Sequence, residues 1–166
     1  YVKQLVGLMF FYGLITYLVI IVSFNLPFLM QENHFDAEAS GVVISLFYLA
    51  IVVPGFFLNK ILSACRSLTK CLSLLCIAIG LALILVSTEI VVMSIGAILM
   101  GFGYGVMQPV IYDQTTRVAS PEKTTLALAF VMSMNYLAIL LAPPFIDALS
   151  SIFHIHSQQF AFVLNL

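Results

Sequence analysis

The chain has 166 residues, of which 63% are hydrophobic and only 8% are charged, and its formal net charge is −1. A soluble domain of this size needs far more polar surface, so the composition excludes a water-soluble globular protein. It also offers no basic face for nucleic acid, and we expect no nucleic-acid partner. A lipid bilayer accepts an apolar outer surface, which favours an integral membrane protein.

Five apolar runs are each long enough to cross the hydrocarbon core, for which a helix needs about 20 residues. The predicted spans are about 4–30, 40–58, 68–87, 90–112 and 125–149, and a sixth begins near 159 and is truncated at 166. The runs do not alternate between apolar and polar residues, which disfavours strands. We therefore predict an all-α, polytopic transmembrane helix bundle that forms a single domain over 1–166. Both ends look like cuts from a longer protein.

The basic residues predict the orientation of these spans. If the spans alternate in direction, all six Lys and Arg residues fall on one side of the membrane and all three His residues on the other. By the positive-inside rule the basic side is cytoplasmic, so the N-terminus is expected inside. No ionisable Asp, Glu, Lys, Arg or His occupies the middle of a span. Because such residues usually mark proton pathways, any proton-titrating carboxylate is expected outside this sequence.

A short motif at the end of the second span carries a resemblance to a known family. The run Pro54-Gly55-Phe-Phe-Leu-Asn59-Lys60 is followed by Arg66. It resembles the cytoplasmic loop motif of the major facilitator superfamily, Gly-x-x-x-Asp-Arg/Lys with a later Gly and more basic residues. Asn59 replaces the usual Asp and the later Gly is missing, which is similar to the copy in the family's second half.

Two further segments fit the same family. The glycine-rich run from Gly96 to Pro109 looks like its tenth helix, and Ala142-Pro143-Pro144 lies where its exporters carry Gly-Pro motifs. The chain thus resembles the C-terminal six-helix half, helices seven to twelve. The resemblance implies a missing six-helix half, expected on the same chain, and alternating access about a midplane site. It also implies that the first and fourth spans line the cavity, the second and fifth flank it, and the third and sixth face lipid.

Polar side chains inside the spans are the candidates for contact with a small-molecule substrate. An unbonded polar group is costly in hydrocarbon, so such groups are expected to face protein or a water-filled cavity. The substrate-cavity candidates are Tyr12, Thr16, Tyr17, Asn25, Tyr104, Gln108 and Asn135. The four-residue spacing of Tyr104, Gln108 and Tyr112 predicts a polar stripe on one helix face. Interfacial anchoring, bonds to the helix backbone and contacts between helices stay open as alternatives.

Glycines and prolines are expected to shape the fourth and fifth spans. The hinge or packing candidates are Gly101, Gly103, Gly105, Pro109, Pro143 and Pro144. Gly101 and Gly105 form Gly-x-x-x-Gly, which permits close helix packing, and a hinge in a moving helix is the alternative. Each proline removes a helical hydrogen bond, so kinks are expected. The amide of Gln108 could satisfy the backbone freed by Pro109. Asn25, close to Pro27, marks either an outer gate or a simple distortion.

Charged residues near the cytoplasmic helix ends are candidates for a gate. They are Lys60, Arg66, Asp113 and Arg117. Asp113 and Arg117 lie four residues apart and would pair if the fourth helix continues that far. The alternatives are that Asp113 reaches Lys60 or Arg66 across the loop, or that all four are solvated.

Together these features predict a secondary active transporter that moves a small solute by alternating access. A proton-coupled exporter, or antiporter, of drug-like or amphipathic compounds is the narrower hypothesis, and the expected location is a bacterial inner membrane. No cofactor or metal is predicted, because His154 and His156 have no Cys or carboxylate partner at ligand spacing. A non-transporting membrane scaffold remains an alternative. An intramembrane enzyme is disfavoured because every His lies in an outer loop.

Overall fold

The computed structural model describes residues 2–153, apart from the side chains of residues 65 and 66, and this part of the chain is almost entirely helical. The long helices are α1 (Val2–Glu32), α2 (Ala37–Cys65), α3 (Thr69–Val86), α4 (Ile90–Val118) and α5 (Thr124–Phe153). Two short 3₁₀ turns, η1 (Arg66–Leu68) and η2 (Pro121–Lys123), precede α3 and α5. Each of the five long helices is long and apolar enough to cross a membrane. The predicted all-α transmembrane bundle is confirmed for these residues.

Most of the helices extend past the spans predicted from the apolar runs. The second span was expected to end at Leu58, but α2 continues to Cys65, and α4 continues six residues past Tyr112 to Val118. Apolar runs report only the length of helix that matches the lipid core, whereas polar residues can prolong a helix into the headgroup region. As a result Lys60, Asp113 and Arg117 lie on helices rather than in loops. The predicted sixth span near 159 lies outside the described residues, as do His154 and His156 of the loop before it.

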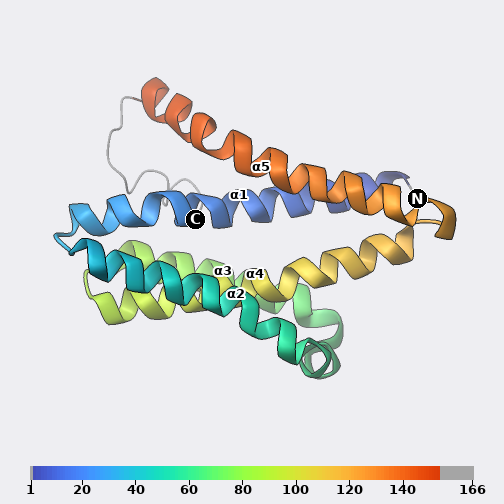
Figure 1. The fold of residues 1–166 in the computed structure, drawn as a ribbon, viewed down its shortest axis with the longest axis horizontal. Helices are drawn as coiled ribbons and strands as arrows, with labels where there is room; N and C mark the ends of the chain where they lie inside the picture. Colours follow the sequence, from blue (N-terminus) through green and yellow to red (C-terminus); the bar gives the residue numbers. More distant parts are fainter. Residues whose placement is uncertain (1, 154–166) are drawn as a thin grey trace.

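A tight turn joins α1 to α2. His34 adopts the left-handed conformation with φ of 64°. The backbone N–H of His34 donates to the carbonyl of Gln31 at 3.0 Å, and that of Phe35 donates to Met30 at 3.0 Å. These two bonds form a Schellman motif, which satisfies the last carbonyls of α1 and reverses the chain. The connection is therefore short, and α2 runs antiparallel to α1 (Figure 1).

The helices form two groups. Helix α4 packs mainly against α2 and α3, whereas α1 packs mainly against α5. Figure 1 shows α1 and α5 together on one side of the molecule and α2, α3 and α4 together on the other. Of the five helices, α4 is the most buried. The contacts between the two groups, chiefly α1 with α4 and α4 with α5, are less extensive.

Glycines make the close contacts of α4 possible. A Cβ added to Gly101 or Gly105 would collide with the carbonyl oxygens of Phe47 and Ile51 on α2. On another face of α4, a Cβ added to Gly103 would lie only 2.7 Å from the carbonyl oxygen of Ser73 on α3. Real Cβ atoms do not approach backbone oxygens so closely, so only glycine fits at these positions. Small residues at helix interfaces are how membrane helices bring their backbones together.

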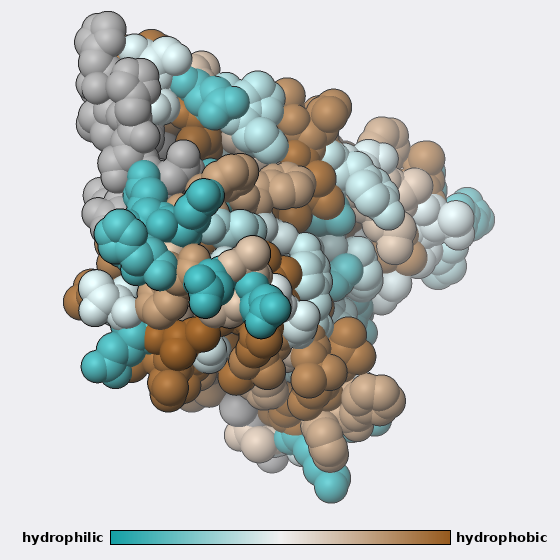
Figure 2. Space-filling view, turned by 60° about the vertical axis from the view of Figure 1, so that its left-hand side comes forward, coloured by the Kyte–Doolittle hydropathy of each residue, from teal (hydrophilic) through white to brown (hydrophobic). Residues whose placement is uncertain are grey.

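The outer surface of the bundle is strongly apolar. Large side chains such as Phe10, Phe56 and Leu140 are more than two-thirds exposed. Figure 2 shows hydrophobic side chains over much of one face, with hydrophilic ones gathered in patches. This arrangement suits a surface in contact with lipid or with further membrane helices. The helix ends that lie beside the N-terminus in Figure 1 are called the basic end below. The segments there hold the basic residues Lys3, Lys60, Lys70, Arg117 and Lys123.

Candidate functional site

A hydrogen-bonded network of polar side chains joins α1, α4 and α5 inside the bundle. Its members are Tyr12 and Thr16 on α1, Tyr104, Gln108 and Tyr112 on α4, and Asn135 on α5. The four-residue spacing on α1 and on α4 places each set on one face of its helix. These two faces meet, and Asn135 approaches them from α5.

One part of the network is a junction of all three helices. The hydroxyl of Thr16 donates to Oδ1 of Asn135 at 2.6 Å. The hydroxyl of Tyr104 donates to the same oxygen at 3.4 Å and lies 3.4 Å from Oγ1 of Thr16. Thr16 is fully buried. Because an unbonded hydroxyl or amide is costly in an apolar interior, these bonds remove a penalty that would otherwise oppose packing.

The other part of the network links α1 to α4 nearer the basic end. The hydroxyls of Tyr12 and Tyr112 lie 2.9 Å apart, and their rings meet edge to face with centroids 5.6 Å apart. The side-chain amide of Gln108 donates to the Tyr112 hydroxyl at 3.3 Å. Gln108 therefore bonds to this network, and not to the backbone that Pro109 frees.

The network keeps unused hydrogen-bonding capacity. Within the described residues, Nδ2 of Asn135 and Oε1 of Gln108 have no protein partner. Asn135, Gln108 and the two tyrosines of α4 are partly exposed, whereas Tyr12 and Thr16 are fully buried. The α4 and α5 side chains are therefore the accessible part of the network, and the α1 hydroxyls are its buried part. Such an arrangement can bind a hydrogen-bonding solute without any charged group.

The structure gives different contacts for the other two of the seven cavity candidates, Tyr17 and Asn25. The ring of Tyr17 packs edge to face on Phe145 of α5, with centroids 5.8 Å apart, so this side chain lies between α1 and α5. The amide of Asn25 donates to the carbonyl of Ile21 in its own helix at 3.0 Å. Asn25 also lines a cleft of about 330 Å³ with Pro143 and Asp147, at the end of the molecule opposite the basic end.

The proline-containing segments remain helical. Helix α4 continues through Pro109, and α5 continues through Pro143 and Pro144 without an interruption. A bilayer favours this outcome, since neighbouring helices can compensate for the backbone groups that a proline frees. Whether these positions act as hinges remains a prediction.

The three charged candidates whose side chains the structure describes, Lys60, Asp113 and Arg117, do not form one cluster. Nε of Arg117 lies 2.9 Å from a carboxylate oxygen of Asp113, as their spacing on a continued helix predicts. Both side chains are more than half exposed, so the pair contributes only about 0–1 kcal/mol. The Lys60 ammonium instead lies 6.0 Å from the ring centroid of Phe57. The Arg66 side chain lies outside the described residues.

The sequence gives too little weight to two residues, Tyr112 in the network and Lys70 at the basic end. Tyr112 was placed on the polar stripe but not among the cavity candidates, although its spacing from Gln108 was the available signal. Lys70 was read only as an orientation signal, yet it lines a cleft of about 410 Å³ with Asp113 and Arg117. Nothing in the sequence separates a basic residue in a cleft from one in open solvent. Among the described residues, no group of three or more His, Cys, Asp or Glu side chains could hold a metal ion.

Comparison with known proteins identifies a family. The sequence matches the family model of the Major Facilitator Superfamily over residues 5–166. No curated protein matches it. The family match covers all five described helices except the first residues of α1.

Proposed function

Because this chain belongs to the Major Facilitator Superfamily of membrane transporters, we propose that it binds its solute at the network on α1, α4 and α5. The observation that carries the proposal is the partly exposed polar stripe of α4, whose Gln108 and neighbouring Asn135 each keep a free hydrogen-bonding group. Members of this superfamily are transporters and not enzymes. That favours solute translocation over catalysis, and a purely scaffolding role would leave the free groups unexplained.

The chain is proposed to be the C-terminal half of the transporter. A second six-helix half, on the same polypeptide, would face the polar stripe and close the cavity around the solute. The exposed apolar side chains of α2 and α5 support this proposal, since they suit contact with further helices or lipid. The two halves would rock about the bound solute to give alternating access.

Solute binding can drive this change only if the solute binds one state more tightly than the other. The network suits that requirement, since it bridges the α1/α5 group and the α2/α3/α4 group, between which contacts are limited. A solute that forms hydrogen bonds with Gln108 or Asn135 would compete with the hydrogen bonds that these side chains make within the network. The glycine-packed contacts of α4 with α2 and α3 would keep that group rigid.

The narrower proposal is a proton-coupled exporter of amphipathic compounds in a bacterial inner membrane. The basic end would face the cytoplasm, by the positive-inside rule. The network is neutral, so the titrating carboxylate would belong to the other half. Tyrosine rings beside neutral hydrogen-bonding groups suit molecules with an apolar body and a few polar groups.

The test uses the complete transporter in proteoliposomes and a pH gradient, with ethidium as the probe. We expect gradient-dependent ethidium transport that a protonophore abolishes. Tyr104→Phe removes a hydroxyl that donates to Asn135, and should weaken transport about fivefold, the effect of losing roughly 1 kcal/mol. Tyr136→Phe is the matched control, because this tyrosine of α5 is 70% exposed and lies outside the network.

Two outcomes would contradict these proposals separately. Equal transport by the Tyr104 and Tyr136 variants would show that the network does not contact the solute. Ethidium movement that ignores the pH gradient, or no movement at all, would refute the proton-coupled exporter while leaving membership of the transporter superfamily intact.

A further inference from the structure

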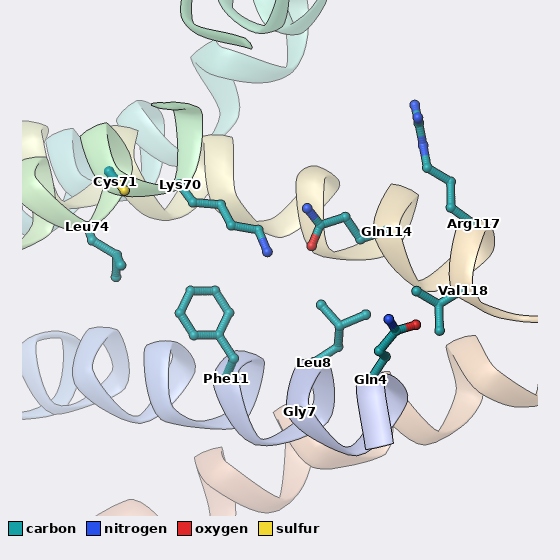
Figure 3. A pocket seen from close by; sticks show the side chains of 10 residues that line it. All are labelled: Gln4, Gly7, Leu8, Phe11, Lys70, Cys71, Leu74, Gln114, Arg117 and Val118. Carbon is teal, nitrogen blue, oxygen red and sulfur yellow. The ribbon is translucent and has the colours of Figure 1, made fainter. Parts of the chain in front are cut away.

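An apolar groove lies at the basic end, separate from the polar network, and the ammonium group of a lysine projects into it. It has a volume of about 690 Å³ and runs between α1, α3 and α4. Figure 3 shows Leu8 and Phe11 of α1 pointing into it from one side, with Leu74 and Lys70 of α3 on the other. Gln4, Gln114 and Arg117 contribute further polar groups near its end. The walls are therefore mostly hydrocarbon, and the polar groups gather toward the helix ends.

Lys70 is the unusual member of this groove. Its side chain is half-buried, and its ammonium lies 5.5 Å from the ring centroid of Phe11. In Figure 3 the ammonium projects into the groove between Phe11 and Gln114. The nearby carboxylate of Asp113 is paired with Arg117. Within residues 2–153 the Lys70 ammonium forms no ion pair with a carboxylate, so it brings an unpaired positive charge to the groove.

We propose that this groove binds one anionic phospholipid. An acyl chain would lie along Leu8, Phe11 and Leu74, and the headgroup phosphate would lie beside the Lys70 ammonium. Charge complementarity selects this occupant, since basic pockets between transmembrane helices favour anionic headgroups. A zwitterionic lipid would bring its own cation toward Lys70 and Arg117. A soluble phosphate would neutralise Lys70 but leave the apolar walls in contact with water.

The proposal does not depend on the network being the solute site. Phe11 and Leu8 precede Tyr12 in α1, and Gln114 follows Tyr112 in α4, so a lipid here would contact the two helices that the Tyr12–Tyr112 bond joins. Lipid composition would thereby change how firmly α1 and α4 are held together at the basic end.

The experiment is native mass spectrometry of the complete transporter, released from nanodiscs that contain equal amounts of phosphatidylglycerol and phosphatidylcholine. We expect the wild type to retain phosphatidylglycerol preferentially. Lys70→Gln should reduce that preference about fivefold, the effect of roughly 1 kcal/mol for one basic residue near a membrane surface. Lys60→Gln is the matched control, because it removes a lysine that also lies near a phenylalanine at the basic end but lines no part of this groove.

Two further variants test the groove itself. Leu74→Trp keeps the charge and fills the apolar wall, so it should also lose the bound lipid, whereas Lys70→Arg should retain it. Added glycerol phosphate should not displace the lipid. The proposal is overturned if Lys70→Gln and Lys60→Gln retain phosphatidylglycerol equally, if Leu74→Trp retains it fully, or if glycerol phosphate competes for the site. If another part of the complete protein fills the groove, Lys70→Gln and Lys60→Gln would also retain phosphatidylglycerol equally.

Discussion

Replacing Gly105 by alanine tests whether the close packing of α4 on α2 limits the stability of the bundle. The added Cβ would overlap the carbonyl oxygen of Ile51 and lie 2.9 Å from its carbonyl carbon and 3.0 Å from its Cα. All three atoms belong to the backbone of α2, so no side-chain rotation can relieve the contact. The helices must separate, and overpacking of this kind costs about 1–3 kcal/mol.

The matched control is Gly41→Ala in α2, where an added Cβ would meet nothing within 4 Å. There the helix should gain about 0.5–1 kcal/mol, since alanine is the better helix former. Thermal unfolding in detergent can measure both, because about 2–4 °C corresponds to 1 kcal/mol in a chain of this size. We expect a lower Tm for Gly105→Ala, by roughly 5 °C, and an unchanged or higher Tm for Gly41→Ala.

The same pair of variants separates the packing interpretation of Gly105 from the hinge interpretation. If both variants are equally stable and equally active, the contact with Ile51 does not constrain the fold and the reasoning fails. If Gly105→Ala is as stable as the control yet transports poorly, the glycine serves a moving helix. A loss of stability in Gly105→Ala that Gly41→Ala does not share would support close packing as the role of this glycine.

The remaining predictions concern polar groups. Thr16→Val keeps the shape of the side chain but removes a donor to Asn135, so it should lower the free energy of unfolding by about 1–3 kcal/mol. Thr16→Ser keeps the hydroxyl and should lower it less. Equal losses for the two variants would mean that the hydroxyl is unimportant. Asp113→Asn removes the exposed pair with Arg117 and should change stability by less than about 1 kcal/mol, with a smaller effect still at high salt. A larger, salt-independent loss in thermal unfolding would show that the pair is buried in the complete protein.

The helix content of the described residues follows from their apolar runs, but the helix ends do not. A run of about 20 apolar residues must cross the bilayer as a helix, because no other single segment satisfies its own backbone there. The residues beyond the run are mixed in polarity, and their conformation depends on local hydrogen bonds. The extension of α4 through Asp113 and Arg117 is of this kind, with a side-chain ion pair on the added turn.

The polar stripe on α4 could be predicted, but its partners could not. Regular spacing places Tyr104, Gln108 and Tyr112 on one face, yet only the packing of α1 and α5 decides which hydroxyl meets which amide. Tyr17 illustrates the difficulty, because it directly follows Thr16 in the sequence but points about 100° away around the helix. It therefore meets Phe145 of α5.

One face of α4 makes two kinds of contact along its length. Gly101, Gly105, Gln108 and Tyr112 follow one another at spacings of four, three and four, so they share one helix face. The two glycines meet the α2 backbone, while the two longer side chains belong to the network with α1. In lipid there is no hydrophobic drive to bring helices together, so association depends on close packing and on polar bonds. The change from glycine to long polar residues thus marks the point along α4 where its close contact with α2 ends. Beyond this point α4 contacts α1, which it holds less tightly and through hydrogen bonds. Under the proposed function, those polar bonds are the ones that a solute would replace.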